Sequence, residues 1–202
     1  MVLIAFHTRR LPHYHPIGQA MFITWRLHDS LPAGRVFPSA TTSGQAFLAM
    51  DRILDNARTG PLYLRQPEIA NMVVEAIEYR DRSLGHYHLH SYVVMGNHVH
   101  ILITPRVHVS KLTHSLKRIT AREGNRILGL TGQPFWQDES YDRVVRDEAE
   151  FGRIAHYIEM NPVQAGMVTT PEEYAWSGAG PINNRPQVYN LPHKSEDKLP
   201  HC

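Results

Sequence analysis

The stretch HYHLHSYVVMGNHVHILIT, residues 86–104, decides the fold. Its first part, residues 86–95, is rich in aromatic and β-branched residues and predicts a strand, and residues 99–104 predict another. Gly96 and Asn97 lie between the two runs and are typical of a tight turn. We therefore expect the two strands to pair as an antiparallel hairpin.

The elements expected around this hairpin set the order of the fold. Two further strands are predicted, at residues 21–27 and around residues 141–145. Helices are predicted from apolar spacing and capping residues at 45–57, 67–79, 109–127 and 147–161, and the first two are expected to share a layer. The order strand, helix, strand, strand, helix, strand is that of the split β-α-β arrangement. We therefore expect an α+β protein of ferredoxin-like or RRM-like architecture, with an antiparallel sheet, helices on one face and one extra C-terminal helix.

The chain is long enough for one domain with an arm and a tail. Residues 1–18 are expected to form a basic N-terminal arm, residues 19–178 the domain, and residues 179–202 a flexible tail rich in Pro, Asn and charged residues. The segment from 30 to 66 is longer than such a fold requires, and the sequence leaves its role open.

The composition excludes several kinds of site. Among 202 residues there are 21 Lys and Arg against 19 Asp and Glu, and a net charge of +2 gives little reason to expect a nucleic-acid partner. There are 14 histidines but one cysteine, Cys202, which excludes intramolecular disulfides, zinc–thiolate clusters and thiol catalysis. Any metal must therefore be held by nitrogen and oxygen. Because no targeting signal is recognisable and no apolar run approaches roughly 18 residues, we expect a cytoplasmic protein with no membrane partner.

His98 and His100 form the most informative local motif. Residues two apart in a strand point to the same face, so the two imidazoles lie side by side while Val99 points to the opposite face. This geometry suits one metal ion. Two half-buried histidines bonded to backbone carbonyls would give the same pattern, and for an isolated motif this interpretation is favoured because short motifs recur by chance.

A second cluster, His86, His88 and His90, shares one face of the preceding predicted strand. It fits loosely the triple-histidine signature of histidine-triad nucleotide hydrolases, in which one histidine attacks a phosphate. A true triad motif lies near the chain end, whereas substantial helical sequence follows here. An exposed polar strand edge is therefore the favoured interpretation.

The last predicted helix adds further candidates. Its apolar stripe carries Tyr157 and Asn161, which are four residues apart, on one flank. Three segments in this order, NHVHIL at 97–102, PFWQDESYDRVVRDE at 134–148 and HYIEMNPVQAG at 156–166, resemble the single-tyrosine transposases of the His-hydrophobic-His class. The resemblance is greatest to the REP-associated tyrosine transposases and covers about residues 21–177. Gly96 stands where many of these relatives have proline, which should alter only the turn.

The resemblance implies a role for each matching residue. Tyr157 matches the nucleophile, and the predicted C-terminal helix that carries it would be the catalytic helix. His98 and His100 match the metal-binding pair, and Asn161 matches the third metal ligand. Tyr141 is a rival nucleophile by residue type, although packing within its strand is the simpler role.

The resemblance also implies the reaction and the partners. The chain would be a metal-dependent endonuclease and strand transferase, with Mg²⁺ or Mn²⁺ as cofactor. It would cleave hairpin-bearing single-stranded DNA, such as REP-like repeats, through a 5′-phosphotyrosine intermediate, as a monomer or a homodimer. A catalytically silent, domesticated protein that binds hairpin DNA without cutting it is the alternative.

Basic residues predict where DNA binds. The helix after the histidine strand and its approach carry only one acidic residue against six basic ones, Arg106, Lys111, Lys117, Arg118, Arg122 and Arg126. Because this helix is expected to adjoin the active site, we expect it to contact the phosphate backbone. Arg9 and Arg10 of the arm are further candidates, and Phe135 and Trp136 are candidates for stacking on unpaired bases.

Overall fold

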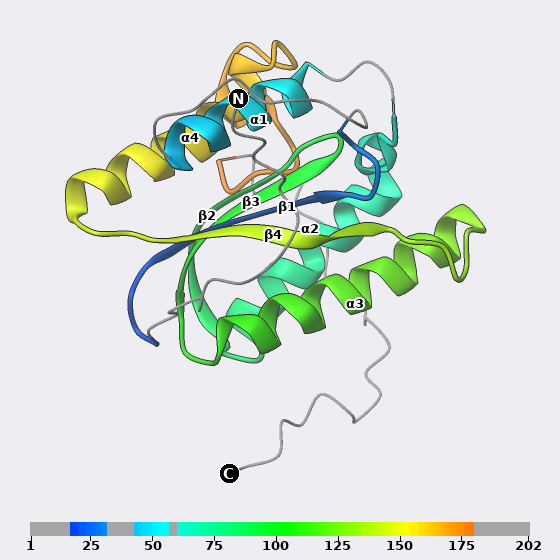
Figure 1. Cartoon of the computed structure of the whole chain (residues 1–202), viewed down its shortest axis with the longest axis horizontal. Coiled ribbons are helices and arrows are strands. Elements are labelled where there is room, and N and C mark those ends of the chain that lie inside the picture. Colours follow the sequence, from blue (N-terminus) through cyan, green and yellow to red (C-terminus); the bar gives the residue numbers. More distant parts are fainter. Residues whose placement is uncertain (1–16, 32–42, 57–59, 180–202) are drawn as a thin grey trace, which may run out of the picture.

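A four-stranded antiparallel sheet forms the centre of the fold (Figure 1). The computed structural model describes residues 17–31, 43–56 and 60–179, so Arg9, Arg10 and nearly all of the predicted tail lie outside the described residues. The strands are β1 (Met21–Leu27), β2 (Tyr87–Val94), β3 (His98–Pro105) and β4 (Trp136–Val144). Their order is β2-β3-β1-β4, with every neighbouring pair antiparallel. This is the predicted ferredoxin-like arrangement, and the hairpin of β2 and β3 turns at Gly96 and Asn97 as expected.

In the described part of the chain, two helices cover each face of the sheet (Figure 1). One pair is α2 (Pro67–Arg82) and α3 (Val109–Leu128), and the other is α1 (Ser43–Asp55) and α4 (Glu148–Gln164). Short 3₁₀ turns lie at Tyr63–Arg65 and Pro171–Glu173. The expectation that α1 and α2 share a layer is therefore wrong. Within the described part of the chain, none of the helices has the length and apolar character needed to span a membrane.

The alternation of side chains along β1 and β3 explains the two layers. Met21, Ile23 and Trp25 of β1 point into the core shared with α2 and α3, whereas Phe22 packs in the second core with α1 and α4. Along β3, Ile101 lies in the first core and Leu102 in the second. Since side chains two apart share a face, His98 and His100 point to the side covered by α1 and α4.

The segment between α3 and β4 differs from the sequence-based prediction. Phe135 and Trp136 are buried in the first core, and Trp136 Nε1 donates a hydrogen bond to Thr120 Oγ1 at 2.8 Å. The strand consequently begins at Trp136 and not near Tyr141. The expectation that these two aromatic rings stack on DNA bases is wrong, because both already fill the core.

Helix α4 also departs from the prediction, since it continues past Asn161 to Gln164. Pro162 lies in its last turn, where the missing N–H costs one hydrogen bond and the Ala165 N–H still donates to the Asn161 carbonyl at 2.9 Å. The predicted helix start is confirmed, because the Asp147 side chain accepts a hydrogen bond from the Glu150 N–H at 2.7 Å.

Candidate active site

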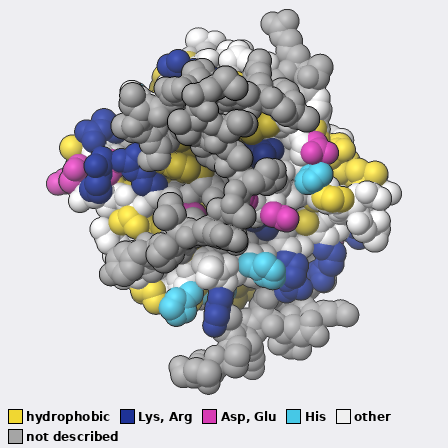
Figure 2. Space-filling model, in the orientation of Figure 1, with side chains coloured by type: hydrophobic (Ala, Val, Ile, Leu, Met, Phe, Trp, Pro, Cys, Tyr) yellow, Lys and Arg dark blue, Asp and Glu magenta, His cyan; other side chains and the backbone are white. Residues whose placement is uncertain are grey.

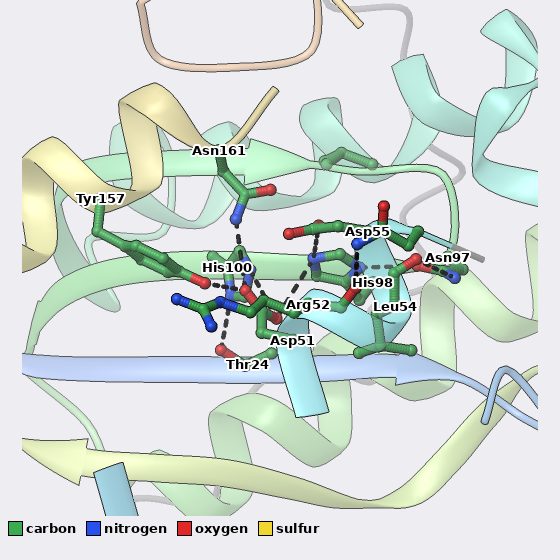
Figure 3. Close-up of polar contacts among 12 residues, drawn as sticks. Thr24, Asp51, Arg52, Leu54, Asp55, Asn97, His98, His100, Tyr157 and Asn161 are labelled. Carbon is green, nitrogen blue, oxygen red and sulfur yellow. Dashed lines mark hydrogen bonds and ion pairs between the residues drawn. The ribbon is translucent and has the colours of Figure 1, made fainter. Parts of the chain in front are cut away.

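The two motif histidines lie at the centre of the sheet, under α1 and α4 (Figure 3). Both are completely buried, and their ring centroids are 4.7 Å apart. The prediction that they share one face of the strand is confirmed. Neither bonds a backbone carbonyl through its outward-facing Nε2 atom, which has no hydrogen-bond partner among the described residues.

A polar side chain lies within hydrogen-bond distance of the Nδ1 atom of each histidine. Asn97 Nδ2 donates to the Leu54 carbonyl at 3.0 Å, so Asn97 Oδ1 is the atom that lies 2.7 Å from His98 Nδ1. An amide oxygen only accepts, and His98 Nδ1 must therefore carry the hydrogen. On the other histidine, Nδ1 of His100 is 2.7 Å from Thr24 Oγ1. This backing is typical of metal-binding histidines, whose second nitrogen is usually fixed by a hydrogen bond.

The electrostatics keep the free nitrogen of His98 available as a ligand. Burial lowers the pKa of His98 to about 3, so its imidazole is neutral at physiological pH. With the hydrogen on Nδ1, the Nε2 lone pair faces the Oδ1 atoms of Asp51 and Asp55, each 3.6 Å away. Burial, and next the charge of Asp51, raise the pKa of Asp55 to about 7.

Asp51 joins the histidines to α4 (Figure 3). Its side chain is only 1% exposed, and its Oδ1 atom lies 3.3 Å from His100 Nε2. Its other oxygen, Oδ2, accepts a hydrogen bond from the Tyr157 hydroxyl and one from Asn161 Nδ2 at 3.4 Å. Residues from three distant parts of the chain therefore meet at a single carboxylate.

Packing fixes the two α4 residues over the sheet. The Tyr157 ring meets Phe22 and Phe47 edge-on, with centroid distances of 6.4 and 6.3 Å, and its centroid is 5.8 Å from that of His100. Asn161 is one turn further along the helix and is completely buried. The sequence-based expectation that these residues lie on the same side of α4 is thus met, and both face the histidine pair.

The donor set of this site fits a divalent cation. Among the described residues, five buried polar atoms here have no hydrogen-bond partner: Asp51 Oδ1, Asp55 Oδ1, His98 Nε2, His100 Nε2 and Asn161 Oδ1. Leaving buried polar atoms unpaired is costly, and acceptors facing one another need a positive charge or a proton between them. Ligand atoms of Asp51, His98 and His100 all lie within 4.8 Å of one another, so the three side chains form a group that could hold one metal ion.

Sequence reasoning missed Asp51 and Asp55. Both lie in the segment 30–66 whose role the sequence left open, and they are four apart on α1, so they share one helix face. The four-residue spacing of the two aspartates was the one feature of the sequence that could have indicated them. Pairs of acidic residues four apart are common on solvated helices, and only the contact with His98 and His100 distinguishes this one.

The other candidates from the sequence lie elsewhere. Tyr141 stacks on Phe47 with a centroid distance of 4.5 Å, in line with a packing role. His88 and His90 are exposed on β2, where His90 Nε2 lies 2.8 Å from Thr104 Oγ1, and His86 precedes the strand. These positions match the polar strand edge favoured from the sequence.

The basic residues of α3 lie across the sheet from the histidines. The apolar side of α3 packs in the first core, so the expectation that this helix adjoins the site is wrong. Lys117 Nζ donates to the backbone carbonyls of Gln137 and Asp138 at 2.6 and 2.9 Å, and Arg126 pairs with Glu123 at 2.6 Å.

Figure 2 shows Lys and Arg side chains over α3 and over the junction of β4 and α4. A groove of about 590 Å³ between α3 and β4 has a mixed lining of apolar, basic, hydroxyl and acidic side chains, which include Ser110, Thr113, Lys117, Arg118, Asp138 and Asp142.

Comparisons with known proteins relate this chain to transposases. The fold is similar to that of a solved structure described as a REP-associated tyrosine transposase bound to a REP hairpin, with a TM-score of 0.53 and 18% identity over 92% of this chain and 96% of that chain. No curated protein matches the sequence. A family model described as "Transposase IS200 like" matches residues 65–161, which include His98, His100, Tyr157 and Asn161. Residues 65–161 of this chain are therefore similar to the IS200-like transposases.

Proposed function

We propose that the protein cleaves and rejoins hairpin-bearing single-stranded DNA through a covalent bond to Tyr157. The observation that carries this proposal is the meeting of Tyr157 and Asn161 with the buried pair His98 and His100, although 57 residues separate Tyr157 from His100 in the sequence. The structural neighbour described above is bound to a REP hairpin, and we extend that class of substrate to this chain.

The chemistry proposed for Tyr157 is a phosphodiester exchange. Its phenol oxygen attacks the scissile phosphorus, the bond from phosphorus to the 3′ oxygen breaks, and the phenol loses its proton while the 3′ oxygen gains one. The products are a 5′-phosphotyrosine and a free 3′-hydroxyl. Because one phosphodiester replaces another, attack by a 3′-hydroxyl can reverse the step and rejoin the strand without ATP.

The free energy needed to activate this tyrosine follows from its pKa. An ordinary tyrosine has a pKa of about 10, so at neutral pH its phenoxide form costs roughly 4 kcal/mol. We infer that His98, His100 and Asn161 hold Mg²⁺ or Mn²⁺, which would polarise the scissile phosphate and offset charge developing on its oxygens. The chain's own contribution is to keep the His98 imidazole neutral, to orient both imidazoles and to exclude water from around them.

DNA binding is proposed to involve the α3 side of the molecule. Lys111, Arg118 and Arg122 are exposed on this helix, and their cationic groups are suited to phosphates. The adjoining groove adds hydroxyl groups, although Asp138 and Asp142 also line it. Since α3 and Tyr157 lie on opposite faces of the sheet, the hairpin and the strand to be cut would contact different sides of the protein. We further infer that the protein acts in the cytoplasm, as a monomer or a homodimer.

A covalent-adduct assay tests the proposal. The full-length protein is incubated with Mn²⁺ and single-stranded DNA that carries a hairpin and a 5′-labelled or 3′-labelled flank, and products are separated under denaturing conditions. We expect a protein–DNA adduct that retains only the 3′ flank, because Tyr157 becomes joined to the 5′ phosphate. The Tyr157→Phe variant should form none, while Tyr141→Phe, the matched control on β4, should form the adduct at a near wild-type rate.

Two results would overturn this assignment. An adduct that survives in Tyr157→Phe and disappears in Tyr141→Phe would show that the other tyrosine is the nucleophile. Tight binding of the hairpin by wild-type protein, with no cleavage under any divalent cation, would favour the DNA-binding alternative.

A further inference from the structure

The helix α1 belongs to the segment that the sequence left unexplained, and it lies outside the residues matched by the family model. It nevertheless contributes a carboxylate to the centre of the site. We propose that Asp51 is a metal ligand through Oδ1 and a positioning residue for Tyr157 and Asn161 through Oδ2. This inference rests on the proposed function, since it assigns Asp51 to the same reaction.

The burial of Asp51 is the first argument. Its side chain is 1% exposed, and its Oδ1 atom faces His100 Nε2 at 3.3 Å and His98 Nε2 at 3.6 Å without a hydrogen bond to either. A buried carboxylate is costly unless a positive charge or a donor compensates it. Since His98 presents a lone pair on this side, a cation between the three atoms accounts for the arrangement.

The second carboxylate oxygen of Asp51, Oδ2, orients the two α4 residues. Oδ2 accepts the Tyr157 hydroxyl hydrogen bond, which orients the phenol oxygen toward the histidines. It also accepts from Asn161 Nδ2 at 3.4 Å, and this contact sets the orientation of the amide and leaves Asn161 Oδ1 unpaired and buried. One carboxylate thus fixes both α4 residues relative to the metal-binding pair.

The attachment of α1 argues that this contact is built into the fold. Phe47 packs edge-on against Phe22 with centroids 5.3 Å apart, and Leu54 is buried. The Leu54 carbonyl accepts from Asn97, the residue that also orients His98. The helix carrying Asp51 and the turn carrying the histidine motif are therefore joined directly.

Asp55 is a useful comparison within the same helix. Its Oδ1 atom lies 3.6 Å from His98 Nε2 and, among the described residues, has no hydrogen bond to Tyr157 or Asn161. If any acidic residue near the histidines could serve as the metal ligand, substitution of Asp51 and of Asp55 would weaken metal binding equally. If Asp51 alone joins the metal site to Tyr157 and Asn161, its substitution should have the larger effect.

Mn²⁺ binding without DNA tests the inference. Titration calorimetry on the full chain would compare wild type with Asp51→Asn, Asp51→Ala, Asp55→Asn and Asp29→Asn. Asp29 is the matched control, because its side chain is 82% exposed in the turn after β1 and its φ of 56° suits asparagine. Thermal unfolding of each variant would confirm that it folds.

We expect Asp51→Asn and Asp51→Ala to weaken Mn²⁺ binding at least tenfold, Asp55→Asn to weaken it less, and Asp29→Asn to leave it unchanged. With Mn²⁺ raised to saturation, adduct formation by Asp51→Asn should remain at least tenfold slower than wild type, because Tyr157 has lost its partner. Mn²⁺ affinity that is unchanged in Asp51→Asn, together with faster adduct formation, would overturn the inference and show that Asp51 blocks the substrate position. If the Mn²⁺ affinity depends on Asp51 but wild type forms no adduct, the ligand assignment stands and only the proposed function fails.

Discussion

Asn97 Oδ1 accepts a hydrogen bond from Nδ1 of His98, with 2.7 Å between the two atoms. The bond determines which nitrogen of His98 carries the hydrogen and leaves Nε2 free to bind a cation. In Asn97→Ala this constraint is lost, and we expect Mn²⁺ affinity to fall about 10- to 100-fold, as is usual when a partner of a ligating histidine is removed. Titration calorimetry on the DNA-free protein measures it.

The matched controls lie at the second histidine. Thr24→Val removes the hydroxyl 2.7 Å from His100 Nδ1 and should also weaken Mn²⁺ binding, whereas Thr24→Ser keeps the hydroxyl and should bind as wild type. Equal affinities in Asn97→Ala, Thr24→Val and wild type would mean that these side chains do not orient metal ligands.

The exposed cations of α3 should determine how DNA affinity depends on salt. Each phosphate contact contributes about 0.7 to 0.9 to the slope of log K against log salt concentration. We expect Lys111→Gln and Arg122→Gln each to reduce that slope by about this amount, measured by fluorescence anisotropy with a labelled hairpin. Arg82→Gln is the control, because Arg82 pairs with Glu78 on α2. A slope that is unchanged in both α3 variants would exclude these residues from the DNA contact.

Two glycines in helices should respond in opposite ways to alanine. A Cβ at Gly124 in α3 would lie 2.6 Å from Phe135 Cε2, and this ring is buried against Trp136, so Gly124→Ala should destabilise the protein by about 1–3 kcal/mol. Gly152 in α4 has open space around it, and Gly152→Ala should stabilise by about 0.5–1 kcal/mol through helix propensity. Urea unfolding gives both values, and a stabilised Gly124→Ala would show that Phe135 can move.

Glu150 near the start of α4 should make stability depend on pH. Its carboxylate accepts hydrogen bonds from the Arg146 side chain and N–H and pairs with Arg143. The side-chain hydrogen bond from Arg146 is the main cause that lowers the pKa of Glu150 below its usual 4.5, although burial opposes it. A lowered folded pKa stabilises the protein above the unfolded pKa, and the stabilisation is lost as the pH falls through the folded value.

We therefore expect wild type to be more stable than Glu150→Gln at pH 7, with the difference shrinking as the pH falls below about 4.5. Urea unfolding at a series of pH values measures it. Glu148→Gln, an exposed change in the same helical turn, should show little difference at any pH. A Glu150→Gln deficit that persists undiminished at pH 3 would point to lost packing and not to lost charge.

Local sequence patterns determined much of this protein. The alternation in residues 86–104 gave the hairpin, and the spacing of His98 and His100 gave two imidazoles on one face. The spacing of Tyr157 and Asn161 placed them on one side of a helix. Each of these features depends on the fixed period of a strand or a helix, which is independent of the rest of the chain.

Only the tertiary structure decided which face of the sheet each helix covers and which side chains contact His98 and His100. Asp51 and Tyr157 are 106 residues apart, and their contact depends on α1 and α4 packing on the same side of the sheet. Likewise, the basic residues of α3 lie across the sheet from Tyr157, because the apolar stripe of that helix fits the opposite core. No periodicity encodes such contacts, since they arise from the burial of apolar surface on two sides of one sheet. The sequence by itself therefore determined the two histidines and the tyrosine as candidates, and the packing of the sheet brought them together with an aspartate that no motif indicated.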